Sequence, residues 1–197
     1  MPSAASALCS AAVNEPRVQR MAAGDEDTLL RAAGQGDPDA CGEVYRRFAG
    51  VIHGIALAHV GVQEAEDVAQ EAFVAIYGGI AGVRGGAALA AWVCTVARNA
   101  AIDHLRRRRR RPVHEPLGEI PSEGLDAEVE DGRAALVFAQ VQRLPVAYRE
   151  TLVLRFVEGL TGPEIASRTG MTHGSVRVNL CRGMALLRPL LEKEGLL

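Results

Sequence analysis

Apolar residues recur at helical spacing along most of the chain, and no segment alternates between apolar and polar residues as a strand would. A short helix is predicted over residues 25–34, ended by Gly34 and Gly36. Asp37 and Pro38 match the residue types preferred at a helix N-cap and at the first helical position, and they predict the start of a second helix. The core-facing stripe of this second helix is expected at Val44, Tyr45, Phe48, Ile52 and Ile55.

A third helix is predicted from Glu64 to Tyr77, with Val68, Ala72, Phe73 and Ile76 inward and Asp67, Gln70, Glu71 and Val74 on the opposite, exposed face. Five glycines between Gly78 and Ala88 predict a loop. A long helix then runs from Leu89 into a run of arginines and ends at Pro112. Trp92, the sole tryptophan, is predicted to anchor the core rather than to stack on a base.

Residues 112–132 contain three prolines, seven acidic residues and few large apolar groups, which is typical of a flexible linker. Beyond it, helices are predicted at about residues 133–143, 146–158, 163–169 and 172–191. Residues 1–24 show no helical period and are predicted to form a disordered leader. The predicted fold is therefore all-α, with two small helical domains at 25–111 and 133–197 joined by an acidic flexible linker.

The segment from Pro163 to Met184 carries the residues that a helix-turn-helix needs. Ala166 is small where two helices would cross, Gly170 suits a turn with positive φ, and Val176 can anchor the second helix. That spacing alone fits an ordinary helical hairpin equally well, but exposed arginines favour a DNA-binding one. The predicted DNA-contacting set is Thr172, which would also cap the helix, His173, Ser175, Arg177, Asn179 and Arg182.

Charge is distributed unevenly behind a formal net charge of -2. Arg106 to Arg111 form a basic run, and residues 133–197 hold 9 basic against 5 acidic residues, so phosphate is a reasonable local partner. The four cysteines are far apart, with no CxxC pair and no histidine at metal-ligand spacing, and are expected to be free thiols in the cytoplasm. No catalytic constellation, phosphate-binding glycine loop or membrane span is apparent, so we expect no enzyme, no metal and no cofactor.

Both halves resemble bacterial sigma factors of the extracytoplasmic-function (ECF) group within the sigma-70 family. In the first half the matching text is Glu64-Ala-Glu-Asp-Val-Ala-Gln-Glu-Ala-Phe and Ala91-Trp92-Val-Cys-Thr-Val-Ala-Arg98-Asn99-Ala-Ala-Ile-Asp103-His-Leu-Arg-Arg. In the second half it is Leu144-Pro145, Tyr148-Arg-Glu, Glu158-Gly-Leu, Glu164-Ile-Ala and Gly174-Ser-Val-Arg. The likeness spans about residues 25–190, in the right order.

The resemblance implies core RNA polymerase and promoter DNA as partners, with the first domain on the −10 element and the second on the −35 element. It assigns Asp67, Gln70 and Glu71 to polymerase binding and the loop at residues 79–88 to capture of a flipped base. The residues it assigns to −10 DNA are Arg98, Asn99, Asp103, Arg106 and Arg107. It also makes an anti-sigma factor a candidate partner, although no residue of the sequence points to one.

Plainer interpretations stay open for each of these surfaces. The acidic helix face and the arginine run could each be merely solvated. The whole chain could instead be a stand-alone dimeric helix-turn-helix regulator that binds palindromic sites. The sequence also departs from the family, because Gly85 to Ala88 replace the usual aromatic and polar loop residues, and Val178, Asn179 and Met184 make the recognition helix less polar and less basic.

Overall fold

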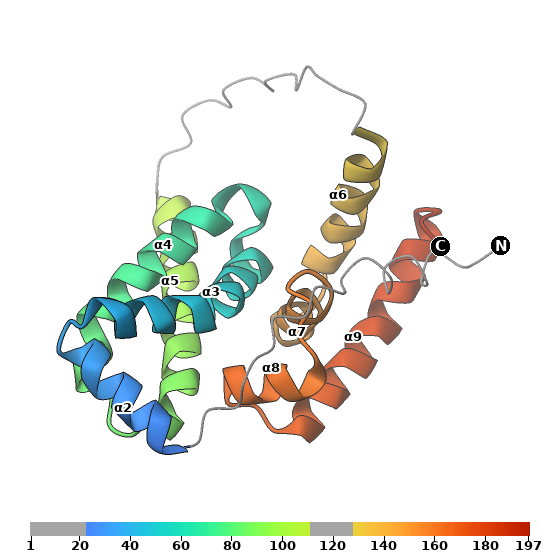
Figure 1. Ribbon diagram of the computed structural model, residues 1–197. Coiled ribbons are helices and arrows are strands. Elements are labelled where there is room, and N and C mark those ends of the chain that lie inside the picture. Colours follow the sequence, from blue (N-terminus) through green and yellow to red (C-terminus); the bar gives the residue numbers. More distant parts are fainter. Residues whose placement is uncertain (1–22, 111–127) are drawn as a thin grey trace.

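The computed structural model describes residues 23–110 and 128–197, and every regular element in these two ranges is a helix (Figure 1). The first half contains α2 (Ala23–Gly34), α3 (Pro38–Val60), α4 (Val62–Gly79), the short 3-10 turns η1 (Ile80–Gly82) and η2 (Gly86–Ala88), and α5 (Leu89–Arg110). The second half contains α6 (Glu128–Gln142), α7 (Val146–Phe156), α8 (Gly162–Thr169) and α9 (His173–Lys193). The predicted all-α class is confirmed, whereas residues 1–22 of the predicted leader, residue 111 and residues 112–127 of the predicted linker lie outside the described residues. Ala23 and Gly24, which were predicted to belong to the leader, instead begin α2.

Helix α3 is the centre of the first half, with α2, α4 and α5 packed around it. It begins as predicted, because the Asp37 carboxylate accepts a hydrogen bond from the Ala40 amide at 2.8 Å and Pro38 occupies the first turn. Val44, Phe48, Ile52 and Ile55 are fully buried. The prediction that Tyr45 joins this stripe is wrong: it is 50% exposed, because a residue next to Val44 is rotated by about 100° around the helix.

The glycine-rich segment after α4 is more regular than the loop predicted there, since α4 continues to Gly79 and is followed by η1 and η2. Helix α2 lies across this segment, and the Gly86 amide donates a hydrogen bond to the Asp27 carboxylate. A Cβ on Gly86 would lie 2.5 Å from Glu26 Cβ and 2.7 Å from the Glu26 carbonyl carbon. Gly86 is therefore required by the close approach of α2, which explains why a larger side chain is missing here.

The helices of the second half lie close to their predicted ranges, but α6 begins at Glu128, inside the segment predicted to be linker. Helix α7 packs on α9, where Gly183 allows the approach: a Cβ at this position would lie 3.0 Å from Leu152 Cδ1. Leu152, Leu187 and Leu191 are buried in this small core.

The two halves also pack against each other, which the sequence did not predict. Helix α7 lies on α3, and α8 lies against α5 (Figure 1). The α3–α7 contact is close at Gly54, where a Cβ would lie 2.8 Å from Leu154 Cδ2. The side-chain amide of Gln142 adds a hydrogen bond to the Leu57 carbonyl oxygen at 2.9 Å.

Candidate nucleic-acid interface

The helix-turn-helix forms from α8 and α9, as the sequence predicted. Ile165, Ala166 and Val176 are buried between the two helices, and Gly170 adopts the left-handed conformation at φ 72°. Helix α8 begins with a capping box in which the Thr161 and Glu164 side chains bond each other's backbone amides, a start signal that sequence analysis missed. These contacts fix α9 relative to α8, so its outward face is a rigid surface.

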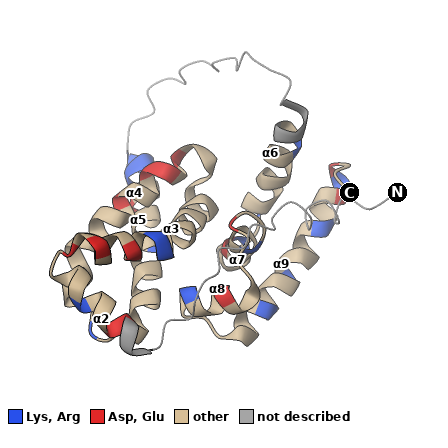
Figure 2. Cartoon of the chain, in the orientation of Figure 1, with Lys and Arg blue, Asp and Glu red and all other residues tan. Residues whose placement is uncertain are grey.

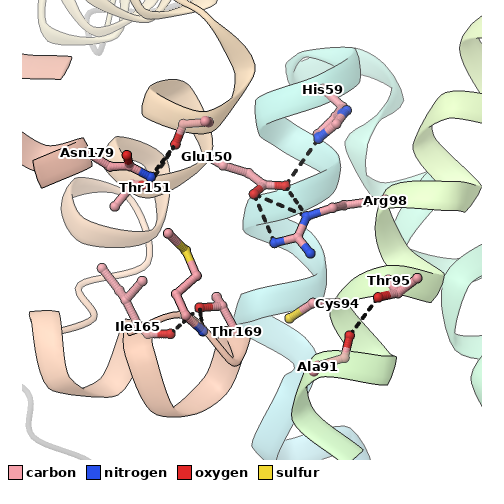
Figure 3. A network of polar contacts seen from close by, with 12 residues as sticks. His59, Ala91, Cys94, Thr95, Arg98, Glu150, Thr151, Ile165, Thr169 and Asn179 are labelled. Atoms are coloured by element: carbon pink, nitrogen blue, oxygen red, sulfur yellow. Dashed lines mark hydrogen bonds and ion pairs between the residues drawn. The ribbon is translucent and has the colours of Figure 1, made fainter. Parts of the chain in front are cut away.

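The side chains predicted to contact DNA on α9 divide into three groups. His173, Arg177 and Arg182 are exposed and available to a duplex. Thr172 and Ser175 form the N-cap, in which the Thr172 hydroxyl accepts from the Ser175 amide at 3.1 Å. Asn179 is instead turned toward α7, with its amide nitrogen 3.4 Å from the Thr151 hydroxyl, so in this arrangement it does not extend outward with the arginines (Figure 3).

A groove between α4 and α5 brings together residues that the sequence had assigned to two different partners. Asp67, Gln70 and Glu71 line the α4 side, and Asn99, Asp103 and Arg107 line the α5 side. Its volume is about 1380 Å³, which is larger than the range of about 300 to 1,000 Å³ usual for small-molecule pockets. Its size and charged lining suit a macromolecular surface better than a small ligand.

Ion pairs join the acidic and basic sides of this groove. Figure 2 shows acidic positions on α4 beside the basic end of α5. Arg107 pairs with Glu71, and Arg108 pairs with Glu64 at 2.9 Å. Arg106 pairs with Asp103 one turn away along α5, at 3.0 Å. Because the partners are largely exposed, such pairs are worth little in stability and can exchange for phosphate at low energetic cost.

Arg98 does not line this groove but faces the second half of the chain. Its guanidinium donates to both oxygens of the Glu150 carboxylate on α7, from Nε to Oε1 at 2.8 Å and to Oε2 at 3.3 Å, and from Nη2 to Oε2 at 3.1 Å (Figure 3). His59 on α3 reaches the same carboxylate at 3.2 Å. Burial tends to raise the pKa of Glu150, yet the hydrogen bonds from His59 and Arg98 outweigh it and hold that pKa below its usual value.

Sequence analysis missed Glu150 and His59 as members of a cluster, and no signal in the sequence could have found them. They lie 91 residues apart, and Arg98 is 52 residues from Glu150, so only the packing of the two halves brings them together.

Trp92 is placed as predicted, partly buried against the core, with its ring near Gly79.

Two family models match the chain in the predicted order. Residues 44–111 match Sigma-70 region 2, and residues 135–187 match Sigma-70, region 4. The chain is 31% identical over 191 residues to the RNA polymerase sigma-H factor of Pseudomonas aeruginosa, covering 85% of this chain and 96% of that one. It is also 31% identical over 165 residues to the ECF RNA polymerase sigma factor SigM of Mycobacterium tuberculosis, covering 83% of each.

The chain belongs to the ECF family of RNA polymerase sigma factors. It is a promoter-directing subunit of the transcription machinery, and the alternative of a stand-alone dimeric regulator is not supported. A solved structure of CnrH, in complex with the cytosolic domain of CnrY, matches the fold with a TM-score of 0.57 and 22% identity, covering 85% of this sigma factor and 97% of that chain.

The described residues of this sigma factor contain no group of three or more His, Cys, Asp or Glu side chains placed to hold a metal ion. Within the same residues, no helix is long and apolar enough to cross a membrane.

Proposed function

We propose that the first domain binds core RNA polymerase through Asp67, Gln70 and Glu71 on α4 and the −10 element through α5. The second domain is proposed to bind the −35 element through the outer face of α9. On this proposal the chain acts in the cytoplasm by binding alone and catalyses no reaction. The observation that carries the proposal is the α4–α5 groove, because an exposed acidic face borders a basic helix end there.

The polymerase contact is supported by the exposure of the α4 face. Asp67, Gln70 and Glu71 are all exposed, and Val74 beside them is 75% exposed. A charged face around an apolar residue suits an interface that electrostatics steers and apolar contact stabilises.

The proposed DNA contacts divide between the two domains. The Asn99 amide can form hydrogen bonds with a base edge. Arg106 and Arg107 pair with Asp103 and Glu71 in the free chain and would exchange these partners for phosphates. On α9, Arg177 and Arg182 are the candidates for base edges or phosphates of the −35 duplex. The η1–η2 segment is proposed to capture a flipped base, and the small residues at 85–88 would leave that role to backbone groups.

Transcription in vitro tests the proposed function directly. Purified chain and core polymerase are incubated with genomic fragments, and transcript starts are compared with those of core polymerase alone. New promoter-specific starts are expected, and starts no different from the core enzyme's refute the proposal.

The polymerase-binding face is tested with Asp67→Lys, which reverses one exposed charge. Glu71→Lys is a less clean variant, because it also breaks the pair with Arg107. Asp67→Lys should abolish co-purification with core polymerase, whereas Asp39→Lys, with the same charge change on the exposed first turn of α3, should not. Equal recovery of polymerase with both variants would refute the proposed polymerase contact, because the α4 face would then be exposed to solvent without binding polymerase.

A protein partner comparable to CnrY is a candidate for this sigma factor. A pull-down with the tagged chain tests for it: a co-purifying protein in addition to the polymerase subunits supports such a partner, and polymerase subunits alone argue against it.

A further inference from the structure

A pocket lies between α2 and the η1–η2 segment, and it shares no lining residue with the α4–α5 groove. The volume of this α2 pocket is about 460 Å³, within the range of about 300 to 1,000 Å³ that is usual for small-molecule pockets. Leu30 of α2 and Ile80 of η1 line it and are only 6% and 1% exposed, so its inner surface is apolar. The α2 pocket therefore has the size and the apolar surface to take one flat ring system.

Two polar side chains near the end of α2 also line the α2 pocket. Within the described residues the Gln35 side-chain amide has no hydrogen-bond partner, and an amide can both donate and accept. Arg31 donates from Nε to the Asp27 carbonyl oxygen at 3.3 Å, which leaves its two terminal nitrogens without a partner among the same residues. Amides and guanidinium groups form paired hydrogen bonds with base edges. The pocket thus combines an apolar inner surface with polar groups that suit the edge of a nucleobase.

Contacts between α2 and the η1–η2 segment fix the walls of the α2 pocket. The Asp27 carboxylate accepts a hydrogen bond from the Gly86 amide. A Cβ on Gly34, at the end of α2, would lie 3.2 Å from Ala81 Cα in η1. A site whose walls are held before the ligand arrives loses less conformational entropy on binding.

Arg84 provides a cation beside the α2 pocket, because it lies between the lining residues Val83 and Gly85. Its side chain is exposed, and within the part of the chain that the structure describes it forms no hydrogen bond or ion pair. Its guanidinium is therefore free to bind a phosphate. A base that belongs to a strand has a phosphate on either side, so this cation favours a nucleic-acid strand over an uncharged ring.

Helix α2 can supply what the η1–η2 segment lacks. Residues 85–88 are glycine and alanine, so they offer no aromatic ring or side-chain amide to a base. Helix α2 packs on both η1 and η2, although it lies outside residues 44–111, which match Sigma-70 region 2.

We propose that the α2 pocket binds one unstacked base of the melted promoter strand, with Arg31 and Gln35 on the edge of the base and Arg84 on an adjacent phosphate. This proposal rests on the proposed capture of a flipped base at the η1–η2 segment. It adds side chains of α2 to the backbone groups of that segment, and it makes α2 part of the promoter-binding surface.

The pocket is tested with holoenzyme and a fluorescein-labelled non-template strand of a promoter found by transcription in vitro. Each base of the −10 element is replaced in turn by an abasic site, which keeps the phosphates. Removal of the captured base should weaken binding to wild-type holoenzyme about tenfold, as expected when a base loses paired hydrogen bonds. In the double variant Arg31→Ala/Gln35→Ala the intact strand should bind about tenfold more weakly, and removal of the same base should have less than about a twofold further effect.

Arg46→Ala/Gln63→Ala is the matched control. It removes the same two types of exposed side chain from α3 and α4, outside the α2 pocket. The ion pair between Arg46 and Glu43 is exposed, so its loss should affect stability little. This control should keep wild-type affinity for the intact strand and the tenfold effect of base removal.

Arg84→Ala tests the phosphate contact separately. It should weaken binding of the intact and the abasic strand by the same factor, because both carry the phosphate. The slope of log affinity against log salt concentration should become shallower by about 0.7, the value for one phosphate contact on a single strand. Arg46→Ala alone should leave the slope unchanged, and an unchanged slope with Arg84→Ala overturns the role of Arg84.

A tenfold effect of base removal in both wild type and Arg31→Ala/Gln35→Ala overturns the α2 pocket as the site, because the base would then be held elsewhere. No sensitive position in the wild type also overturns it. Displacement of the strand by an equimolar free deoxynucleoside monophosphate overturns it as well, because the ligand would then be a nucleotide and not a strand. Wild-type chain that directs no promoter-specific start refutes the proposed function itself.

Co-purification with core polymerase at the wild-type level shows that each variant is folded. If the double variant fails this control, Gln35→Ala alone gives the same comparison at one exposed position after the end of α2. It should reduce the effect of base removal to about threefold, and a full tenfold effect would overturn the proposal.

Discussion

Val176 anchors α9 in the helix-turn-helix, and its truncation tests how that motif is held together. Val176→Ala removes two methyl groups from a side chain that is 1% exposed. At about 0.8 kcal/mol per methyl or methylene group, the lost transfer energy is roughly 1.6 kcal/mol. A residual cavity of about 40 Å³ adds roughly 1 kcal/mol at 24 cal/mol per Å³. The expected loss of stability in the second domain is therefore about 2.5 kcal/mol.

Hydrogen exchange of the α9 amides measures this loss where it occurs. A loss of about 2.5 kcal/mol should speed exchange roughly 70-fold for amides that open with the domain. Val178→Ala is the matched control, because it makes the same change two residues away in the same helix, where the side chain is 44% exposed. It should change stability by less than about 0.5 kcal/mol. Equal acceleration by the two variants, or none by Val176→Ala, would refute the packing argument.

Three further predictions concern other parts of the molecule. Gly86→Ala should destabilise the first domain by about 1 to 3 kcal/mol, because its Cβ collides with Glu26 of α2, whereas Gly82→Ala, with open space around it, should be silent in thermal unfolding. The pKa of Glu150 is lowered, so its contribution to the packing of the two halves is present above the usual glutamate pKa and lost as pH falls through the lowered one. Small-angle X-ray scattering should show the chain expanding in that acid range, and Glu150→Gln should remove the dependence. Arg177→Ala should cost about 1 to 3 kcal/mol at one position of the promoter if it reads a base, whereas an equal loss across all sequences would make it a phosphate contact.

Much of the fold was readable from local pattern. The Asp37-Pro38 start of α3, the exposed acidic face of α4 and the Gly170 turn were all predicted correctly, because each depends on residues within one or two turns of each other. Tyr45 was misplaced since helical spacing gives the width of an apolar stripe only approximately. The start of α6 was misplaced because acidic residues are compatible both with a linker and with the first turn of a helix.

The residues of the candidate site show the same difference between what local pattern predicts and what tertiary packing decides. The sequence by itself determined which side chains α4, α5 and α9 present, because helical periodicity assigns residues to faces. Only the tertiary structure decided what those side chains meet: Asn179 turns to Thr151, Glu71 pairs with Arg107, and Arg98 is taken by Glu150. Such pairings join residues between 28 and 52 positions apart, and their partners are set by how whole helices pack, for which no local pattern carries a signal.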